Sequence, residues 1–424
     1  MATIPLISLR LDLHPIISEL IKEFSFCSEV EPVTGRELAI EFLTMEMPDI
    51  LFIDFGSPKL DCTGLLESMK ADPWLLHGGI IALCRDFEEK MEIEKLQGSN
   101  IIVVLTDREL EDHLPKILRI LETNRRILFQ HEIGSDLVGN VSATFQLGND
   151  LTETACYTNL VCNFLYNTSK LDSKSKESLR GALNELLVNA VEHGNCGITY
   201  DEKSSWLGKG RYIDELIRQK CRAPEINRRT VTFEYRLEAS YARFAITDEG
   251  SGFDWRRLKD PKSDENILKL HGRGIKIARH TTRNLQYNEA GNMVTFELEY
   301  PQKVDHLKPA IFSDIIPVEI EQGRVVFRQG DKSDFLYYII NGQYDVYVNE
   351  NKVSFLGPDD LFMGEMSFLL DNRRSATVTA RTPGRLIKLS KKEFVTAIRK
   401  KPHYALFLAR LLAQRVQRAN QKSV

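Results

Sequence analysis

Residues 364–377, which read GEMSFLLDNRRSAT, constrain the fold and the chemistry of this chain more than any other segment. Glu365 follows a glycine at the expected start of a short helix, where its carboxylate can accept a ribose 2′-hydroxyl. Arg374 carries a planar guanidinium that can bind the charged oxygens of a cyclic phosphate, and exposed amides at the helix start would add partial positive charge. The segment therefore predicts a binding site for a cyclic phosphodiester.

The residues upstream of that segment, 327–347, predict the strands and turns of a small β-barrel, with Gly330 and Gly342 at sharp corners that need a residue without a Cβ atom. Together the two segments resemble the cyclic-nucleotide-binding domain of the catabolite activator protein and of cyclic-nucleotide-dependent protein kinases. The resemblance covers residues 310–424 and implies a jelly-roll barrel with C-terminal helices. The ligand contacts that it implies are Gly364, Glu365, Arg374, Ser375 and Ala376.

The alternative to this ligand site is a surface ion pair between Glu365 and Arg374 on an ordinary β-barrel. The barrel glycines and the RSAT run fit together only in the ligand-binding interpretation, which we therefore prefer. Arg373 is expected to be solvated, because alignment on RSAT selects Arg374 as the phosphate ligand. Ser375 can contact either a guanine amine or the phosphate, so cyclic AMP is favoured only slightly over cyclic GMP.

The composition is that of ordinary globular material, with 42% hydrophobic and 27% charged residues over 424 residues, which is enough for two to four domains. No run of eighteen apolar residues exists, and the first twenty residues carry charges and a proline, so we expect a cytoplasmic protein without a membrane segment. Seven cysteines without a C-x-x-C pair, and nine histidines without metal-ligand spacing, predict neither a disulfide framework nor a zinc site. The net charge of −4 argues against nonspecific nucleic-acid binding.

In the middle of the chain, residues 178–195 predict an amphipathic helix, because leucines recur there at steps of three and four. Glu185, Asn189 and His193 occupy positions i, i+4 and i+8 on its polar side. A carboxylate and an amide oxygen thus project from neighbouring turns, as a site for magnesium and water requires.

The segments that follow this helix are rich in glycine. A predicted strand ends at Asp248, whose carboxylate can accept a hydrogen bond from an exocyclic amine, and the next glycines let the backbone approach a flat ligand. A later pair of glycines opens a predicted helix suited to phosphate, and residues 291–300 predict a closing strand. The residues singled out in these segments are Gly250, Gly252, Gly272, Gly274 and Thr295.

In this order and spacing the segments resemble the Bergerat-type ATP-binding fold shared by gyrase and histidine kinases, and most closely the anti-sigma-factor serine kinases. The resemblance implies that Asn189 holds Mg²⁺, that Asp248 reads the adenine amino group, and that Glu185 is the base that takes the proton of an incoming serine hydroxyl. The other ATP contacts that it implies are His193, Gly250, Gly252, Gly272, Gly274 and Thr295. An ordinary α+β domain with solvated polar positions, and ATP binding without catalysis, are the alternatives.

Two features distinguish this part of the chain from a sensor histidine kinase. His131 lies in a short HEIG segment and not in a long amphipathic helix, so no phospho-accepting dimerisation helix is predicted. Residues 196–230 exceed the loop of the compact serine kinases. They predict either an extra helix that covers the pocket or docks a partner, or a surface insertion.

The first 125 residues alternate hydrophobic strands with helical patterns and predict a parallel α/β sheet. Asp54 ends the central strand and resembles the phosphoacceptor of bacterial receiver domains. The rest of that family's site is altered, since its acidic pair is reduced to Asp12, its hydroxyl becomes Cys84, and its lysine becomes Asp107. An added negative charge in place of the lysine disfavours a phosphoryl group, so we expect a degenerate receiver used for dimerisation or docking, with phosphorylation of Asp54 as the alternative.

The sequence thus predicts three domains: a receiver-like domain at 1–125, a histidine-kinase-like ATP-binding domain at 138–302 and a cyclic-nucleotide-binding domain at 310–424. We expect a bacterial signalling protein, forming a homodimer, whose serine/threonine kinase-like domain acts on an anti-anti-sigma or sigma-factor-like regulator under the control of a cyclic nucleotide. ATP, Mg²⁺ and cyclic AMP are the expected ligands. A nonenzymatic scaffold that sequesters its partner is the alternative. Direct DNA binding is not expected, because little more than one helix follows the barrel.

Overall fold

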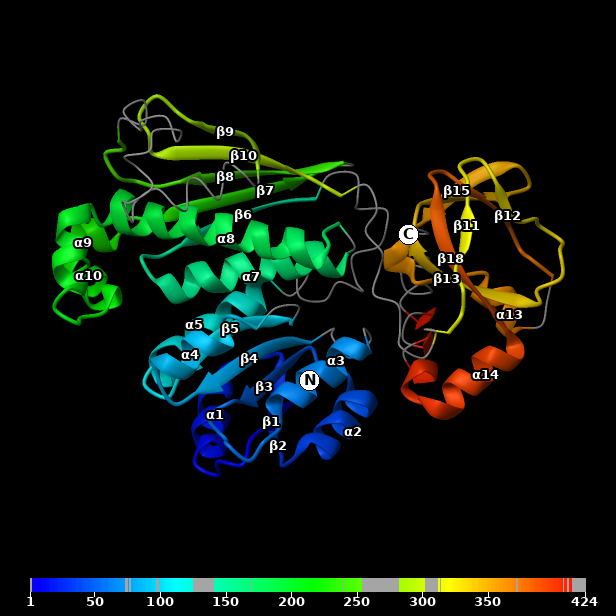
Figure 1. Cartoon of the computed structure of the whole chain (residues 1–424), viewed down its shortest axis with the longest axis horizontal. Helices are drawn as coiled ribbons and strands as arrows, with labels where there is room; N and C mark the ends of the chain where they lie inside the picture. Colours follow the sequence, from blue (N-terminus) through cyan, green and yellow to red (C-terminus); the bar gives the residue numbers. More distant parts are fainter. Residues whose placement is uncertain are drawn as a thin grey trace. The chain divides into compact units, whose positions relative to one another are not determined.

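The computed structural model places three sheet-based folds along the chain, as the sequence predicts (Figure 1). A parallel sheet comes first, an antiparallel sheet with helices second, and a sandwich of two antiparallel sheets last. The structure describes residues 2–72, 75, 78–96, 99–124, 141–168, 170–238, 240–253, 282–301, 312, 314–370, 373–406, 408–409 and 412–413. Within these residues no helix combines the length and apolarity that crossing a membrane requires.

The N-terminal fold is a five-stranded parallel sheet with the strand order β2-β1-β3-β4-β5. Its strands β3 (Ile50–Asp54) and β4 (Gly79–Cys84) are buried along their whole length, as expected for the central strands of a parallel sheet. In sheets of this order, functional groups gather at the carboxyl ends of the strands, which is where Asp54 lies. The other elements are β1 (Ala2–Ile7), α1 (Leu13–Ile21), β2 (Cys27–Val33), α2 (Arg36–Glu46), α3 (Cys62–Ala71), α4 (Phe87–Ile93), β5 (Ile101–Thr106) and α5 (Leu110–Thr123).

The middle fold is a five-stranded antiparallel sheet with the order β6-β7-β8-β10-β9, and helices α7 and α8 run along it (Figure 1). Strand β7 (Val231–Leu237) alternates buried and accessible residues, so one face of the sheet carries the core. Phe233, Phe244 and Phe296 stack on that face, with ring centroids 6.3 and 5.0 Å apart in succession. The other sheet elements and helices are β6 (Val141–Leu147), α7 (Leu151–Asn167), α8 (Ser173–Asn189), β8 (Tyr241–Thr247), β9 (Arg283–Tyr287) and β10 (Met293–Glu299).

Two features between α8 and β7 shape the middle fold further. The helix predicted at residues 178–195 is α-helical only as far as Asn189 and continues as a π-helical turn, η4 (Ala190–Asn195). The long segment before β7 is mostly helical and contains α9 (Tyr200–Leu207), α10 (Ile213–Lys220) and α11 (Pro224–Asn227). The segment thus contains helix, and whether it covers the pocket, docks a partner or is a surface insertion stays a prediction.

The C-terminal fold packs two four-stranded antiparallel sheets, β11-β18-β13-β16 and β12-β17-β14-β15, into a sandwich. Gly330 and Gly342 have φ angles of 87° and 93°, so both predicted corners use backbone conformations that favour glycine. Most of the predicted last helix, 402–420, lies outside the described residues. The elements are β11 (Val318–Ile320), β12 (Val325–Phe327), β13 (Phe335–Asn341), β14 (Tyr344–Val348), β15 (Asn351–Leu356), η8 (Pro358–Asp360), β16 (Phe362–Met363), α13 (Glu365–Leu369), β17 (Thr377–Ala380), β18 (Gly384–Ser390) and α14 (Lys391–Lys400).

Candidate functional sites

The polar side of α8 brings a carboxylate and an amide together, as its sequence predicts. The side chains of Glu185 and Asn189 lie one turn apart and are half-buried, and Asn189 Nδ2 donates a hydrogen bond to Glu185 Oε1 at 3.4 Å. This contact leaves the amide oxygen of Asn189 available for a cation. Amide and carboxylate oxygens are the ligands that Mg²⁺ accepts in nucleotide sites, so the two residues fit the predicted metal-ATP role.

The π-helical turn η4 changes the direction of the polar side chains that follow Asn189. A π-helix takes more residues per turn than an α-helix, so His193 does not repeat the α-helical position of Asn189. The side chain of His193 is exposed, and its Nδ1 lies 2.6 Å from the carbonyl oxygen of Ile198. His193 thus contacts the loop after the turn, and its predicted role as an ATP ligand stays a prediction.

Asp248, at the end of β8, lies against the π-helical turn. A Cβ atom at Gly194 would lie 2.3 Å from Asp248 Cγ, and one at Gly250 would lie 2.1 Å from the carbonyl oxygen of Gly194. Only glycine at both positions therefore permits this close approach. Sequence reasoning selected Gly250 but missed Gly194, although Gly194 directly follows His193, the last of the three polar residues predicted on the helix.

The environment of Asp248 suits a carboxylate that binds a neutral amine. Burial raises its pKa, although the hydrogen bond from the Gly250 amide to its Oδ1, 2.9 Å long, and the positive charge of Arg229 act in the opposite direction. The raised pKa shows that desolvation is the stronger effect. A partly desolvated acceptor is what recognition of an exocyclic amino group requires.

Asn195 holds the end of the π-helical turn to the end of β8. It is fully buried; its Oδ1 accepts the amide of Glu249 at 2.9 Å, and its Nδ2 donates to Asn149 Oδ1 at 2.8 Å. Asn195 thus fixes the turn that follows α8, the helix of Glu185, against Glu249, the residue directly after Asp248. The sequence analysis did not identify this residue.

The remaining predicted ATP contacts fall into two groups. Gly252 has a φ angle of 73°, and a Cβ atom there would lie 1.9 Å from the carbonyl oxygen of Ala290, so this glycine is sterically required. Thr295 is a half-buried residue of the sheet, in β10. Gly272 and Gly274 lie outside the described residues.

In the C-terminal fold, Arg374 is only 3% exposed. Its Nη1 donates to the carbonyl oxygen of Gly364 at 2.8 Å and to Ser367 Oγ at 3.2 Å, and its Nη2 donates to the carbonyl oxygen of Phe335. The guanidinium stacks on the ring of Phe327, with Cζ 4.3 Å from the centroid. Arg374 is thus a buried cation whose hydrogen bonds within the described residues go to neutral oxygens.

Two further observations show that an anion would suit Arg374. Its Nε is buried without a hydrogen-bond partner among the described residues. Burial also lowers its pKa, against the opposing effects of Tyr337 and Glu365. A cyclic phosphate would supply both the missing acceptor and the missing charge, so the site fits the predicted ligand.

The other predicted cyclic-nucleotide residues surround Arg374 in sequence and in space. Gly364 has a φ angle of 77°, and a Cβ atom there would lie 2.1 Å from Arg374 Nη1. Glu365 is 5% exposed at the start of α13. Ser375 is exposed and Ala376 is half-buried. Arg373 is exposed, as expected, and donates to the carbonyl oxygen of Gly330 at 2.8 Å.

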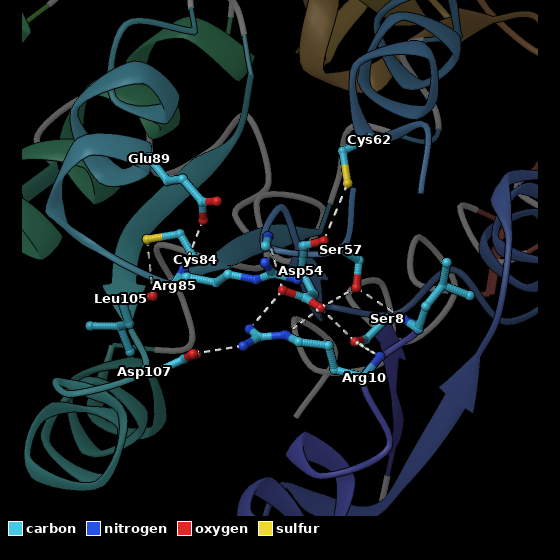
Figure 2. A network of polar contacts seen from close by, with 12 residues as sticks. Ser8, Arg10, Asp54, Ser57, Cys62, Cys84, Arg85, Glu89, Leu105 and Asp107 are labelled. Carbon is cyan, nitrogen blue, oxygen red and sulfur yellow. Dashed lines mark hydrogen bonds and ion pairs between the residues drawn. The ribbon is translucent and has the colours of Figure 1, made fainter. Parts of the chain in front are cut away.

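In the N-terminal fold, the Asp54 carboxylate is fully buried and accepts five hydrogen bonds (Figure 2). Arg10 donates from Nε to Oδ2 at 3.0 Å and from Nη2 to Oδ1 at 2.8 Å. Ser8 Oγ, Ser57 Oγ and the Gly56 amide donate the other three, at 2.6, 2.5 and 3.0 Å. Burial disfavours the ionised form of Asp54, but these hydrogen bonds outweigh it and lower its pKa.

Arg10 also reaches the residue that replaces the receiver lysine. Its Nη1 donates to Asp107 Oδ2 at 2.7 Å, so one guanidinium lies between two carboxylates (Figure 2). The thiol of Cys84 faces the carbonyl oxygens of Asp86 and Leu105, both at 3.5 Å, and burial raises its pKa to about 12. Sequence reasoning missed Arg10, although Arg10 follows β1, where the receiver family carries its acidic pair.

Comparisons with known families identify two of the three folds. Residues 158–298 match the histidine kinase-like ATPase domain family, and residues 317–401 match the cyclic nucleotide-binding domain family. The chain therefore contains an ATP-binding domain of the histidine kinase-like type followed by a cyclic-nucleotide-binding domain. The N-terminal parallel sheet is consistent with a receiver-like fold.

Several known proteins are similar to about a quarter of this chain. The "Cyclic AMP receptor protein" of Thermus thermophilus is 36% identical over 104 residues, which are 23% of this chain and 48% of that protein. The "CRP-like cAMP-activated global transcriptional regulator" of Mycobacterium tuberculosis is 30% identical over 116 residues, 26% of this chain and 51% of that protein. The chain thus spans about half the length of these relatives. The crystal structure of Thermus thermophilus catabolite activator protein is 31% identical with a TM-score of 0.25, covering 26% of this chain and 55% of that one.

Proposed function

We propose that this chain is a signalling protein whose ATP-binding domain phosphorylates a protein regulator on serine or threonine, under the control of a cyclic nucleotide bound by its C-terminal domain. The regulator would be an anti-anti-sigma protein or a sigma-factor-like protein. The observation that carries the proposal is the buried Arg374, whose Nε has no acceptor within the described residues, in a chain that also holds an ATP-binding domain.

The arrangement of α8 supports phosphoryl transfer. In the proposed reaction Asn189 would hold Mg²⁺, which when bound neutralises charge on the phosphates. Glu185, within reach of Asn189, would accept the proton of the incoming hydroxyl. Asp248, placed by Gly194 and Gly250, would bind the adenine amino group and so fix the nucleotide. Positioning and charge neutralisation supply most of the rate enhancement in this class of reaction.

The cyclic-nucleotide site supports control by cyclic AMP. The two relatives described above are named for cyclic AMP, and the match to the cyclic nucleotide-binding domain family, residues 317–401, contains Arg374. A ligand that binds one arrangement of the C-terminal domain more tightly shifts the chain toward that arrangement. The activity of the ATP-binding domain would change if that domain binds ATP better in one of the two arrangements than in the other.

For the N-terminal domain we propose a docking role that does not depend on phosphorylation of Asp54. Arg10 already supplies a fixed positive charge to both oxygens of Asp54, where a receiver would use a metal ion and a lysine. Asp107 holds Arg10 in place from its other side. A phosphoryl group at Asp54 would have to break this network, whose hydrogen bonds are charge-assisted.

Glu185→Gln tests the enzymatic part of the proposal. The variant removes the base but keeps the size of the side chain, so it should bind Mg-ATP normally and lose phosphate transfer from γ-labelled ATP to a purified anti-anti-sigma protein from the same organism. Glu177→Gln, on the same helix in an ion pair with Arg180, is the control and should retain transfer. Equal transfer by the wild type and Glu185→Gln would contradict the role of Glu185, and equal signalling in cells would favour the scaffold.

A further inference from the structure

The N-terminal fold and the C-terminal fold belong to the same compact unit. Residues 1–136 and 302–424 fall into this unit, together with residues 164–172, and the rest of the ATP-binding fold forms another unit. Within the first unit, residues at the ends of α2 and α3 contact the C-terminal fold.

The contact at the end of α3 is a buried pair of an imidazole and a carboxylate. His403 Nε2 donates a hydrogen bond to Asp72 Oδ2 at 2.9 Å, and the two side chains are 2% and 6% exposed. Asp72 is the C-cap of α3, where the helix dipole places partial negative charge, so its own helix disfavours a carboxylate there. A buried carboxylate needs donors, and His403, 331 positions later in the chain, supplies one.

The contact at the end of α2 is apolar. Met47 is the C-cap of α2 and has φ 46° and ψ 63°, the left-handed conformation that favours glycine or asparagine. Its side chain packs against the buried core cluster of the C-terminal fold, to which Tyr404 belongs. This packing explains a methionine at a position that its backbone disfavours. Met47 and Asp72, together with His403 and Tyr404, form what we call the docking surface.

Four buried aromatic rings form a series of contacts from the docking surface to the cyclic-nucleotide site. In order, the rings belong to Tyr404, Phe312, Tyr338 and Phe362. Their successive ring centroids lie 6.1, 5.8 and 5.4 Å apart. Phe362 lies two residues before Gly364, whose carbonyl oxygen accepts a hydrogen bond from Arg374. Because closely packed side chains move together, a displacement of Tyr404 reaches the segment that contains Gly364.

We propose that the receiver-like domain docks on the cyclic-nucleotide-binding domain of the same chain through the docking surface, and that this docking changes the affinity for the cyclic nucleotide. The first part names the partner for the docking role proposed above for the N-terminal domain. The second part rests on the cyclic-nucleotide site proposed above.

Docking and ligand binding must then affect each other to the same extent, because coupling between two equilibria is reciprocal. If loss of docking raises the affinity for cyclic AMP, bound cyclic AMP must loosen the docking surface. If loss of docking lowers that affinity, bound cyclic AMP must tighten the docking surface. The two signs are therefore linked, and each can be measured separately.

Hydrogen exchange of the full-length protein without ligand tests the docking. Asp72→Ala and Met47→Asn change only the N-terminal domain, and the amides of residues 401–406 in the C-terminal domain give the readout. Exchange there should become about tenfold faster or more in both variants, because each loses a buried interaction of the docking surface. Strand β13, in the core of the C-terminal fold, should exchange as in the wild type.

Two features of the variants keep this test independent of misfolding. Asparagine suits the left-handed conformation at the end of α2, so Met47→Asn should leave the N-terminal domain folded. Glu67→Ala is the matched control, because Glu67 is exposed on α3, the helix that Asp72 caps. It should leave exchange at residues 401–406 unchanged.

A calorimetric titration of the full-length protein with cyclic AMP tests the coupling. Asp72→Ala, His403→Ala and the double variant should change the affinity about fivefold or more and to the same extent, because the same contact is lost in all three. Glu67→Ala should bind cyclic AMP as the wild type does. Saturating cyclic AMP should also change the exchange of residues 401–406 in the wild type, in the direction that reciprocity requires.

Three results would overturn parts of this account. Unchanged exchange at residues 401–406 in both Asp72→Ala and Met47→Asn refutes the docking. Faster exchange with unchanged cyclic AMP affinity, or with a sign that violates reciprocity, refutes its effect on the ligand. A wild type that gives no heat with cyclic AMP or cyclic GMP contradicts the proposed cyclic-nucleotide site instead, and the exchange measured without ligand then judges the docking by itself.

Discussion

The Arg10–Asp54 pair offers the sharpest test of the N-terminal network. Arg10→Met removes the guanidinium and keeps an unbranched side chain of comparable reach. Asp54 is fully buried and the Arg10 side chain is 14% exposed, so the variant leaves an ionised carboxylate without its counter-charge. The three hydrogen bonds from Ser8, Gly56 and Ser57 remain, and none of them carries a full positive charge.

The expected cost is large for one side chain. Removing one partner of a buried ion pair destabilises by about 3–5 kcal/mol, because the remaining charge stays desolvated. At about 1.4 kcal/mol for each factor of ten, this corresponds to roughly 10²–10⁴-fold faster local opening. Asp107 also loses its partner, but it is 42% exposed and water replaces most of that interaction.

Hydrogen exchange of the backbone amides of β3, followed by mass spectrometry on the full-length protein, measures this local opening. Lys95→Met is the control, because Lys95 pairs with Glu92 on the surface of the same domain and its loss should cost no more than about 1 kcal/mol. Adding Asp54→Asn to Arg10→Met should restore much of the protection, since the unpaired charge is then gone. Equal exchange in Arg10→Met and Lys95→Met would refute the reasoning.

The remaining predictions concern the ATP site and the pH dependence of Asp54. Asn189→Ala should lose Mg-ATP affinity in a calorimetric titration while the exposed Asn184→Ala on the same helix keeps it; retained affinity in Asn189→Ala would undermine the metal-ligand role. Gly194→Ala should lower ATP affinity, because the three atoms nearest to its Cβ atom all belong to the Asp248 carboxylate, which must move; unchanged affinity would count against the adenine contact. Because the pKa of Asp54 is lowered on folding, its contribution to the protection of β3 should be constant above about pH 3.9 and be lost as the pH falls through the folded value; a loss already near neutral pH would contradict this sign.

Most of the fold could be predicted from the sequence because its strands and helices carry regular patterns. The continuous apolar runs of β3 and β4 predict buried parallel strands, and both are fully buried. Strand β2, Cys27–Val33, was not predicted. It is an edge strand with the residues CSEVEPV, in which glutamates and a proline interrupt any hydrophobic pattern.

The site residues could be predicted only where the residues that interact lie close together in the sequence. Glu185 and Asn189 are four residues apart on one helix, so spacing alone places them together, and their contact is confirmed. Asn195 and Arg10 work through partners 54 and 44 positions away in the chain, Glu249 and Asp54. No pattern within one segment reveals such partners, because they meet only when the sheet forms.

The π-helical turn shows a different limit of sequence reasoning. Residues 178–195 keep a helical pattern throughout, yet the helix changes type after Asn189. Periodicity over so few residues does not separate an α-helical turn from a π-helical one. The difference matters here, because the turn brings Gly194 to Asp248 and directs His193 toward Ile198.

The central claim is that a cyclic-nucleotide site controls an ATP site in the same polypeptide. Its most direct test is a calorimetric titration of Mg-ATP with and without saturating cyclic AMP, in the wild type, in Arg374→Ala and in the exposed control Arg373→Ala. We predict that cyclic AMP changes the ATP affinity of the wild type and of Arg373→Ala by about 5-fold or more, the usual range of coupling between sites, and has no effect on Arg374→Ala. An ATP affinity that is the same with and without cyclic AMP, or no heat from cyclic AMP or cyclic GMP alone, would contradict the claim.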